Sequence, residues 1–407
     1  MIESKINVLV LYAKYADNVS YYDDWIDAFV NEDEFHTTPV NLLKIHGAHH
    51  IKRKISESEC IVLHHSTNAD TTKYIEPFVG NLRDRKGVLL SFVGNEYNRP
   101  VGGIREKRAL FNHIEPDFVA TQCLLEAGEF LFGDCVRERV IAIPHALNPG
   151  VFTPERSLED RPIDIGVRSE KYFMLGDNER NSLFNFFLES ELTNRLVTDI
   201  KVGPEHKLHR RGWAGFLNKC KGTIANESGS WYLDLDDSIV TEVREWALSK
   251  ISSKRYAVMM KIRSHIPLWI LALLWPIAKS NKSLYYGVKK SLSLYNGLHE
   301  EELIQRFYRN RDNAPVYAKC ISSRHFDAIG TKTCQILIRG KYNDILMPDE
   351  HYIAMEPDFS NAVTVIRKFT DVEYRKNIVD RAYEYVRSHH TYSARTKEIS
   401  LLVRSVT

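Results

Sequence analysis

Residues 6–11 (INVLVL) form a short, almost wholly apolar run, which predicts a buried strand. Similar runs follow at residues 60–64 (CIVLH), 88–93 (VLLSFV), 117–120 and 140–143, and helical patterns separate them at 22–30, 74–83 and 123–131. Short strands that are apolar on both faces and alternate with helices are typical of a parallel sheet covered by helices. The first 150 residues therefore predict a Rossmann-like lobe.

A second lobe is expected after residues 144–164, which are rich in proline and charge and predict a linker. A strand-like run at 163–167 starts a new series, followed by a helix near 181–188, strands at 222–226 and 333–338, and a helical finish at 360–403. The predicted divisions are an N-terminal domain at 1–155, a second domain at 160–390 and a final helix at 391–407. The fold class is α/β.

Composition narrows the possible functions. A chain of 407 residues with 43% apolar and 27% charged residues suits two globular domains. Its six cysteines show no CxxC spacing, which argues against a zinc site and a disulfide framework and favours a reducing cytoplasm. The start of the sequence shows no signal-peptide pattern. No GxGxxG turn follows Leu11, which counts against a dinucleotide enzyme.

Three stretches resemble GT-B glycosyltransferases whose C-terminal domain is like that of the spore-maturation glycosyltransferases. They are residues 144–149 (PHALNP) with Phe152 and Pro154, residues 164–168 (DIGVR) with Gly176 and Arg180, and residues 322–328 (SSRHFDA) with 333–338, 351–352 (HY), 358–361 (DFSN) and 390–392 (HTY). The resemblance implies two Rossmann-like lobes whose parallel sheets face a central cleft, and a C-terminal helix that packs back toward the N-terminal lobe. It places the acceptor in the first domain and the donor in the second.

The same resemblance implies transfer of a sugar from a nucleotide-diphosphate donor to a glycan or lipid-linked glycan, without an obligatory metal or other cofactor. Cationic side chains and helix N-termini would then stabilise the leaving diphosphate. The residues expected at the donor site are His145, Arg168, Lys171, Arg180, Glu227, Ser322, Ser323, Arg324, His325 and Asp327. A catalytically inactive GT-B-like protein that binds carbohydrate or nucleotide is the alternative, favoured by Asp327, because the family usually has Glu there.

Each expected donor residue also has an ordinary structural interpretation. Arg324 is expected to grip phosphate with a two-pronged contact and to act in catalysis, or it is a surface arginine on a capped helix. Asp327 is expected to accept hydrogen bonds from the ribose, or it is a solvated first-turn residue. Glu227 contacts the donor or lies in a polar turn. His145 touches the donor or braces the linker.

The N-terminal lobe is expected to supply the catalytic base or a group that positions the acceptor. Glu96, after the predicted strand at 88–93, is the leading candidate, and His65, after the strand at 60–64, is the second. His64 is interpreted as a buried structural histidine. Residues 234–237 (DLDD) only superficially match a metal-binding DxD motif and are interpreted as a polar loop or helix start, so no metal site is predicted.

A basic, apolar segment lies between Glu245 and Glu300, where there is no acidic residue. Residues 266–278 (IPLWILALLWPIA) are too short for a membrane-spanning helix, which needs about 20 residues. Tryptophans and flanking lysines there favour contact with an anionic membrane surface through residues 250–290, and a core helix is the alternative. The protein is therefore expected in the cytoplasm, peripherally at the inner face of the cell membrane. Nucleic acid is not an expected partner.

Overall fold

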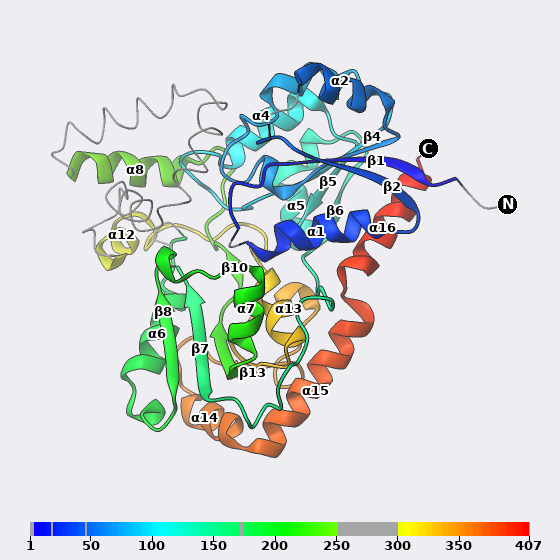
Figure 1. The fold of residues 1–407 in the computed structure, drawn as a ribbon. Helices are drawn as coiled ribbons and strands as arrows, with labels where there is room; N and C mark the ends of the chain where they lie inside the picture. The colour runs from blue at the N-terminus through cyan, green and yellow to red at the C-terminus, as the bar shows by residue number, and fades with distance from the viewer. Residues whose placement is uncertain (1–3, 18, 45–46, 171–174, 251–299, 407) are drawn as a thin grey trace.

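The structure is a computed structural model that describes residues 4–17, 19–44, 47–170, 175–250 and 300–406. It has two lobes, each built on its own parallel sheet, with the N-terminal lobe uppermost in Figure 1. Helices from the end of the chain run up one side and join the lobes.

The N-terminal sheet has six strands in the order β2-β1-β3-β4-β5-β6, all parallel. The strands are β1 (Ile6–Tyr12), β2 (Phe35–Asn41), β3 (Cys60–Leu63), β4 (Val88–Phe92), β5 (Phe118–Thr121) and β6 (Arg139–Ala142). The helices are α1 (Ser20–Val30), α2 (Ala48–Glu57), α3 (Val79–Arg83), α4 (Ile104–Ile114) and α5 (Leu125–Phe132), with 3₁₀ turns η1 (His65–Thr67), η2 (Glu76–Phe78) and η3 (Gly133–Cys135).

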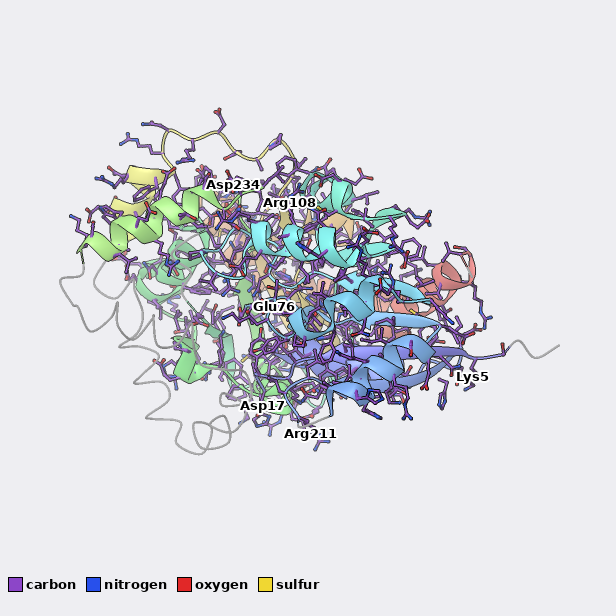
Figure 2. All side chains as sticks on the ribbon, turned by 90° about the horizontal axis from the view of Figure 1, so that it is seen from above. Lys5, Asp17, Glu76, Arg108, Arg211 and Asp234 are labelled. Atoms are coloured by element: carbon purple, nitrogen blue, oxygen red, sulfur yellow. The ribbon has the colours of Figure 1, made fainter. Side chains whose placement is uncertain are left out.

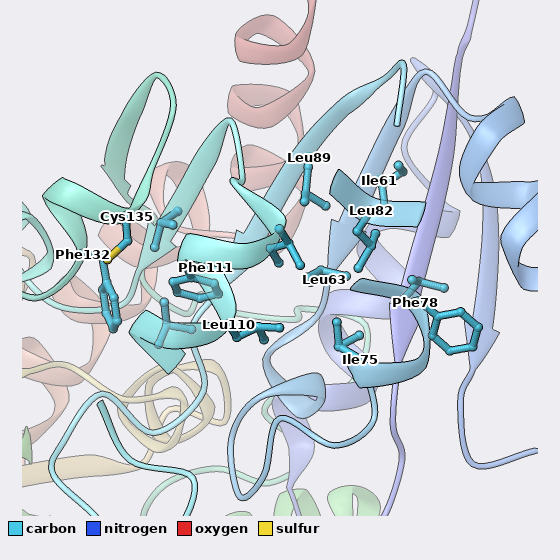
Figure 3. Packing of buried hydrophobic residues seen from close by; sticks show 14 of the residues in the cluster. Ile61, Leu63, Ile75, Phe78, Leu82, Leu89, Leu110, Phe111, Phe132 and Cys135 are labelled. Carbon is cyan, nitrogen blue, oxygen red and sulfur yellow. The ribbon is translucent and has the colours of Figure 1, made fainter. Parts of the chain in front are cut away.

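Alternation along the strands gives this sheet two buried faces. Successive strand residues point to opposite sides, so Val8 and Val10 pack with Trp25 of α1, whereas Leu9 and Leu11 join the core on the other face. Figure 3 shows that second core, where Ile61, Leu63 and Leu89 from the strands lie beside Leu82, Leu110 and Phe111 from the helices. This double burial explains why the strands read as continuous apolar runs.

The C-terminal sheet has five parallel strands in the order β13-β12-β9-β7-β8. They are β7 (Ile163–Ser169), β8 (Thr198–Val202), β9 (Cys220–Ala225), β12 (Cys334–Ile338) and β13 (Ile353–Met355). The helices around it are α6 (Glu179–Glu189), α7 (Arg210–Leu217), α13 (Ser323–Gly330), α14 (Ala362–Thr370) and α15 (Val372–His389), with 3₁₀ turns η4 (Glu191–Thr193), η5 (Pro204–His206) and η6 (Tyr342–Asp344). A Cβ on Gly166 would lie 2.2 Å from Cys220 Sγ, so glycine there permits close packing under α7.

Each sheet has one point where the strand order reverses. In the N-terminal lobe the chain moves from β1 outward to β2 and then back across to β3, and in the C-terminal lobe β7, β8 and β9 repeat this pattern. Open α/β sheets bind ligands outside the carboxyl ends of the strands at such a switch point. The topology therefore offers one position in each lobe, between β1 and β3 and between β7 and β9.

An excursion leaves the C-terminal lobe between β10 (Ser228–Gly229) and β11 (Lys319–Cys320), which pair antiparallel. It contains α8 (Ser238–Lys250) and α12 (Glu300–Phe307), and these project to one side in Figure 1. Its base binds the N-terminal lobe, because Asp237 Oδ2 accepts a hydrogen bond of 2.9 Å from Arg105 N at the start of α4. Asp234, labelled in Figure 2, accepts another from Asn98 Nδ2 at 2.9 Å. The acidic run at 234–237 thus ties the two halves together.

The final helix α16 (Tyr392–Arg404) packs on the N-terminal lobe, as predicted. Its Ile399 and Val403 join the core that contains Trp25. At the crossing point Leu147 N donates to His390 O at 2.9 Å and Tyr392 N donates to Leu147 O at 3.0 Å. Two of the stretches that carry the resemblance, at 144–149 and 390–392, therefore pair with each other in space.

No helix among the described residues is long and apolar enough to span a membrane. The segment at 266–278, with most of the basic stretch at 250–290, lies outside the described residues.

Candidate ligand site

A cavity of about 50 Å³ lies at the switch point of the C-terminal lobe, and three arginines line it. Arg168 comes from the end of β7, Arg180 from the first turn of α6 and Arg324 from the first turn of α13. We call it the arginine cavity. Its other lining residues are Val167, Ser169, Phe184, Trp213, Thr223, Ile224, Ala225 and Gln335. The structure therefore brings together three side chains predicted to bind phosphate, although 144 positions separate Arg180 from Arg324 along the chain.

Neighbouring groups hold the three guanidinium groups in place. Arg180 Nε donates to Asn226 Oδ1 at 3.1 Å, and Arg324 Nη2 donates to Asn226 O at 2.7 Å. Asn226 directly follows β9 and so anchors two cations at the strand end. Arg168 Nη2 pairs with Asp199 Oδ2 at 2.6 Å, and its guanidinium lies 3.9 Å from the centre of the Phe216 ring. Arg168 is thus already paired with a carboxylate.

The cavity is electropositive. None of its lining residues in the described part of the chain is Asp or Glu. His325, which follows Arg324 in the first turn of α13, is fully buried. Burial, and then the charges of Arg324 and Arg180, hold its pKa well below the usual value. The neutral ring accepts a hydrogen bond from Ser322 N at Nδ1 (3.0 Å) and so fixes the start of the helix. Ser323 is the first residue of α13 and is half-buried. An anion is the ligand that this arrangement favours.

Asp327 lies at the contact between the lobes and does not line the arginine cavity. It is 1% exposed, and its Oδ2 accepts hydrogen bonds from Ser20 Oγ of α1 at 3.1 Å and from Trp213 Nε1 of α7 at 3.0 Å. Burial, together with the nearby charge of Asp24, raises its pKa well above the ordinary value. Trp213 connects the two places, because it lines the cavity and also donates to Asp327.

Glu227 belongs to a second buried polar cluster beside Asn226. Its carboxylate accepts from Tyr317 Oη at 2.5 Å and from Tyr342 N at 2.6 Å, and burial raises its pKa. In the same cluster Lys319, 1% exposed, pairs with Glu179 at 2.7 Å and with Asp177 at 3.0 Å. Sequence reasoning missed this lysine, and the only signal was a cation within the otherwise apolar stretch that precedes residues 322–328.

The switch point of the N-terminal lobe is filled with aromatic rings. His65 begins η1, two residues after the end of β3, and is fully buried. Its ring stacks 4.5 Å from Phe92 and makes no hydrogen bond among the described residues. His145 accepts a hydrogen bond at Nδ1 from Trp25 Nε1 at 3.2 Å, and burial lowers its pKa to about 3. The structure therefore shows His145 bracing the linker against α1. His64 Nδ1 bonds to Ser66 Oγ at 2.8 Å.

Glu96 lies beyond the end of β4 and is buried. Its two oxygens accept from Thr121 Oγ1 at 2.5 Å and from Gln122 N at 2.6 Å, and burial raises its pKa to about 7. The interface between the lobes is close by, because Gln122 O accepts a hydrogen bond from Asn343 Nδ2 at 2.9 Å. A carboxyl with this pKa can exchange a proton near neutral pH.

Lys171 lies outside the described residues. In the part of the chain that is described, no three His, Cys, Asp or Glu side chains gather so that they could hold a metal ion. Sequence reasoning also missed Gln335, which lines the cavity as a polar residue inside the apolar strand 334–338.

No protein-family model and no curated protein matches this sequence. Among solved structures, HepE from Anabaena in complex with UDP-glucose aligns with a TM-score of 0.50 at 9% identity, over 98% of this chain and 100% of that chain. A glycosyltransferase from Rickettsia africae aligns at 0.48 and 10% identity over 100% of both chains, and sucrose-phosphate synthase from Thermosynechococcus elongatus at 0.46 and 10% identity over 99% of both. The chain has the GT-B fold, which confirms the resemblance expected from its sequence at the level of fold.

Proposed function

We propose that this protein is a nucleotide-sugar-dependent glycosyltransferase that holds the diphosphate of its donor at the arginine cavity. The observation that carries the proposal is the convergence of Arg168, Arg180 and Arg324 at the switch point between β7 and β9. Glycosyl transfer builds negative charge on the departing diphosphate, and guanidinium groups fixed in advance stabilise that charge. In this proposal the arginines supply the positive charge, so no obligatory metal is included.

Arg324 and Arg180 have the leading roles in this proposal. Asn226 orients both, so their side chains are positioned before the donor arrives. Arg168 acts through the electrostatic attraction of its charge, because its Nη2 already donates a hydrogen bond to Asp199. The fold supports a nucleotide-sugar donor at a general level, since HepE, aligned over nearly the whole chain, was solved with UDP-glucose.

The acceptor side of the proposal is a glycan or lipid-linked glycan, with Glu96 as the proposed base and His65 as the second candidate. Glu96 is favoured because burial brings its pKa to about 7. It also accepts a hydrogen bond from Gln122 N, and Gln122 O accepts one from Asn343 of the other lobe, so Glu96 lies close to the interface between the lobes. Its carboxylate would have to exchange its present partners, Thr121 and Gln122, for an acceptor hydroxyl.

Peripheral binding to an anionic cytoplasmic membrane remains part of the proposal because of the basic, acid-free sequence between Glu245 and Glu300. Flotation with vesicles that contain anionic lipid tests it. Full-length protein should float at low salt and dissociate at high salt, and protein that stays at the bottom of the gradient at low salt would remove this partner.

A non-catalytic binding protein is the second candidate, and one observation favours it. Ser20 and Trp213 occupy the carboxylate of Asp327, and Thr121 and Gln122 occupy that of Glu96. A protein that kept the arginine cavity and lost turnover would show this pattern.

Binding and turnover measurements separate the two candidates. A thermal-shift panel of UDP, GDP, dTDP and CMP should identify one nucleotide that raises Tm, and its sugar conjugates are then assayed for transfer. Arg324→Ala should weaken binding roughly 10- to 100-fold, because a hydrogen bond to a charged group contributes about 1.5–3 kcal/mol. Arg339→Ala is the matched control, since Arg339 is partly exposed and pairs with Glu356. No nucleotide binding would refute the proposal, and binding without turnover would favour the second candidate.

A further inference from the structure

Gln335 is a buried amide that no group in the described part of the chain satisfies. It lies on β12 and is 3% exposed, and neither Oε1 nor Nε2 has a hydrogen-bond partner among the described residues. The side chain lines the arginine cavity, next to Thr223 on the paired strand β9. The unpaired amide therefore meets the same void as the three guanidinium groups.

This arrangement is costly unless something enters the cavity. A buried polar group without a partner costs about 1–3 kcal/mol, whereas an apolar side chain of similar shape costs little at such a site. Leu337, the next residue on the same face of β12, is apolar and fully buried. A glutamine at this position is thus explained by a bound group that pairs with its amide.

The surrounding groups indicate what that bound group is. Guanidinium groups only donate hydrogen bonds. Thr223 Oγ1 donates to Gly166 O at 2.8 Å, and Trp213 Nε1 donates to Asp327. The NH2 of the Gln335 amide is a further donor beside this void. A ligand that accepts from all sides suits such a cavity, and phosphate oxygens only accept at neutral pH.

Size leads to the same ligand. A void needs about 10–15 Å³ to hold one water molecule, so about 50 Å³ has room for a group of a few heavy atoms, such as one phosphate. A nucleoside or a hexose is several times larger. The phosphate end of a ligand can therefore enter, while its nucleoside and sugar stay outside.

We propose that Gln335 is a specificity-determining residue that donates from its amide to a phosphate oxygen of the donor at the floor of the arginine cavity. The inference rests on the proposed function and refines it, because it assigns recognition of the phosphate to a neutral side chain as well as to the arginines. It requires that the effect of Gln335 be confined to ligands that carry phosphate.

Calorimetric titration of the full-length protein tests the role of Gln335. The three ligands are inorganic pyrophosphate, the nucleoside diphosphate found in the thermal-shift panel, and the matching nucleoside. Gln335→Met keeps the shape and removes the amide, and should weaken pyrophosphate and diphosphate binding about 5- to 10-fold. Gln335→Glu places a carboxylate among the arginines and should weaken them more than 50-fold. Neither variant should change nucleoside binding. Tm should be unchanged or higher in both. Gln305→Leu, on the exposed face of α12, is the control.

The outcomes separate this inference from the proposed function. If Arg324→Ala loses pyrophosphate while Gln335→Met and Gln335→Glu retain it, water satisfies the amide, and the inference is wrong while the arginine site stands. If the Gln335 variants lose affinity for nucleoside and diphosphate equally and have a lower Tm, Gln335 has a structural role, and the inference is also wrong. If wild-type protein binds neither pyrophosphate nor any nucleoside diphosphate, the proposed function itself fails.

Discussion

The two switch points of this molecule have the same topology and opposite contents. Between β7 and β9 the strand ends surround a cavity lined by three arginines. Between β1 and β3 the equivalent place is filled by the rings of His64 and His65, with Tyr22 and Trp25 of α1 packed against them. The first of the two is a hollow lined by cations and the second is part of a core.

The difference shows that the strand order supplies only the position of a site. Whether a ligand enters depends on the helix that follows the first strand. In the N-terminal lobe α1 presents Tyr21, Tyr22 and Trp25 to the strand ends. In the C-terminal lobe α6 presents Arg180 instead. Large rings close the first point, whereas a cation keeps the second polar and hollow.

Removing the largest ring should produce the greatest change in stability. Trp25 is fully buried, its ring centre lies 4.6 Å from that of Phe92, and it donates to His145. We expect Trp25→Ala to lower the free energy of unfolding by about 3–5 kcal/mol, measured by denaturant titration. The exposed control Val363→Ala should stay within about 0.5 kcal/mol of wild type. A loss below 1 kcal/mol for Trp25→Ala would mean that this switch point is not a packed core.

Asp24 of α1 should make stability fall as pH rises. Burial raises its pKa from 3.8 to about 7, although Arg210 lies 3.0 Å away. Between these values the folded protein binds a proton that the unfolded chain has lost. The free energy of unfolding therefore decreases from about pH 4 to pH 7, by up to about 1.4 kcal/mol per pH unit. Asp24→Asn should flatten this slope in denaturant titrations across that range, and an unchanged slope would assign it to other groups.

Replacing His65 should have little effect on stability or turnover. Its ring nitrogens have no partners among the described residues, so an apolar side chain of similar size costs little. We expect the free energy of unfolding of His65→Leu to lie within about 1 kcal/mol of the wild-type value, and its turnover rate to stay within about threefold of wild type. Steady-state kinetics decides the point, because loss of a general base costs about 100-fold or more. A loss of that size with normal stability would make His65 the catalytic base after all.

The smallest effect on nucleotide affinity should come from a disulfide bond that links the two lobes. Cys123 and Cys320 lie on different lobes, are buried, and belong to the same packed cluster. Oxidation with copper phenanthroline should form a disulfide between them, seen by mass spectrometry and absent in Cys320→Ser. Since the arginine cavity lies within one lobe, nucleotide affinity should change less than about twofold. A large change would show that the cavity needs movement between the lobes.

The sequence determined much of this architecture because its signals are local. Apolar runs such as 60–64 and 88–93 report burial on both faces of a sheet, and the resemblance at 322–328 located the helix that carries Arg324. Periodicity predicts elements because each residue's exposure follows from the element that contains it. The GT-B arrangement and the return of the last helix to the first lobe were implied by the resemblance to GT-B glycosyltransferases.

Only the tertiary structure decided which polar residues meet. Arg180, Arg324 and Gln335 converge on one cavity, whereas Asp327, three residues beyond Arg324, turns toward Ser20 of the other lobe. Nothing local separates these cases, because successive positions on a helix face in different directions and the partners of these side chains lie far away along the chain. The sequence determined the elements, and long-range packing decided that arginines surround a cavity at one switch point and that aromatic rings fill the other.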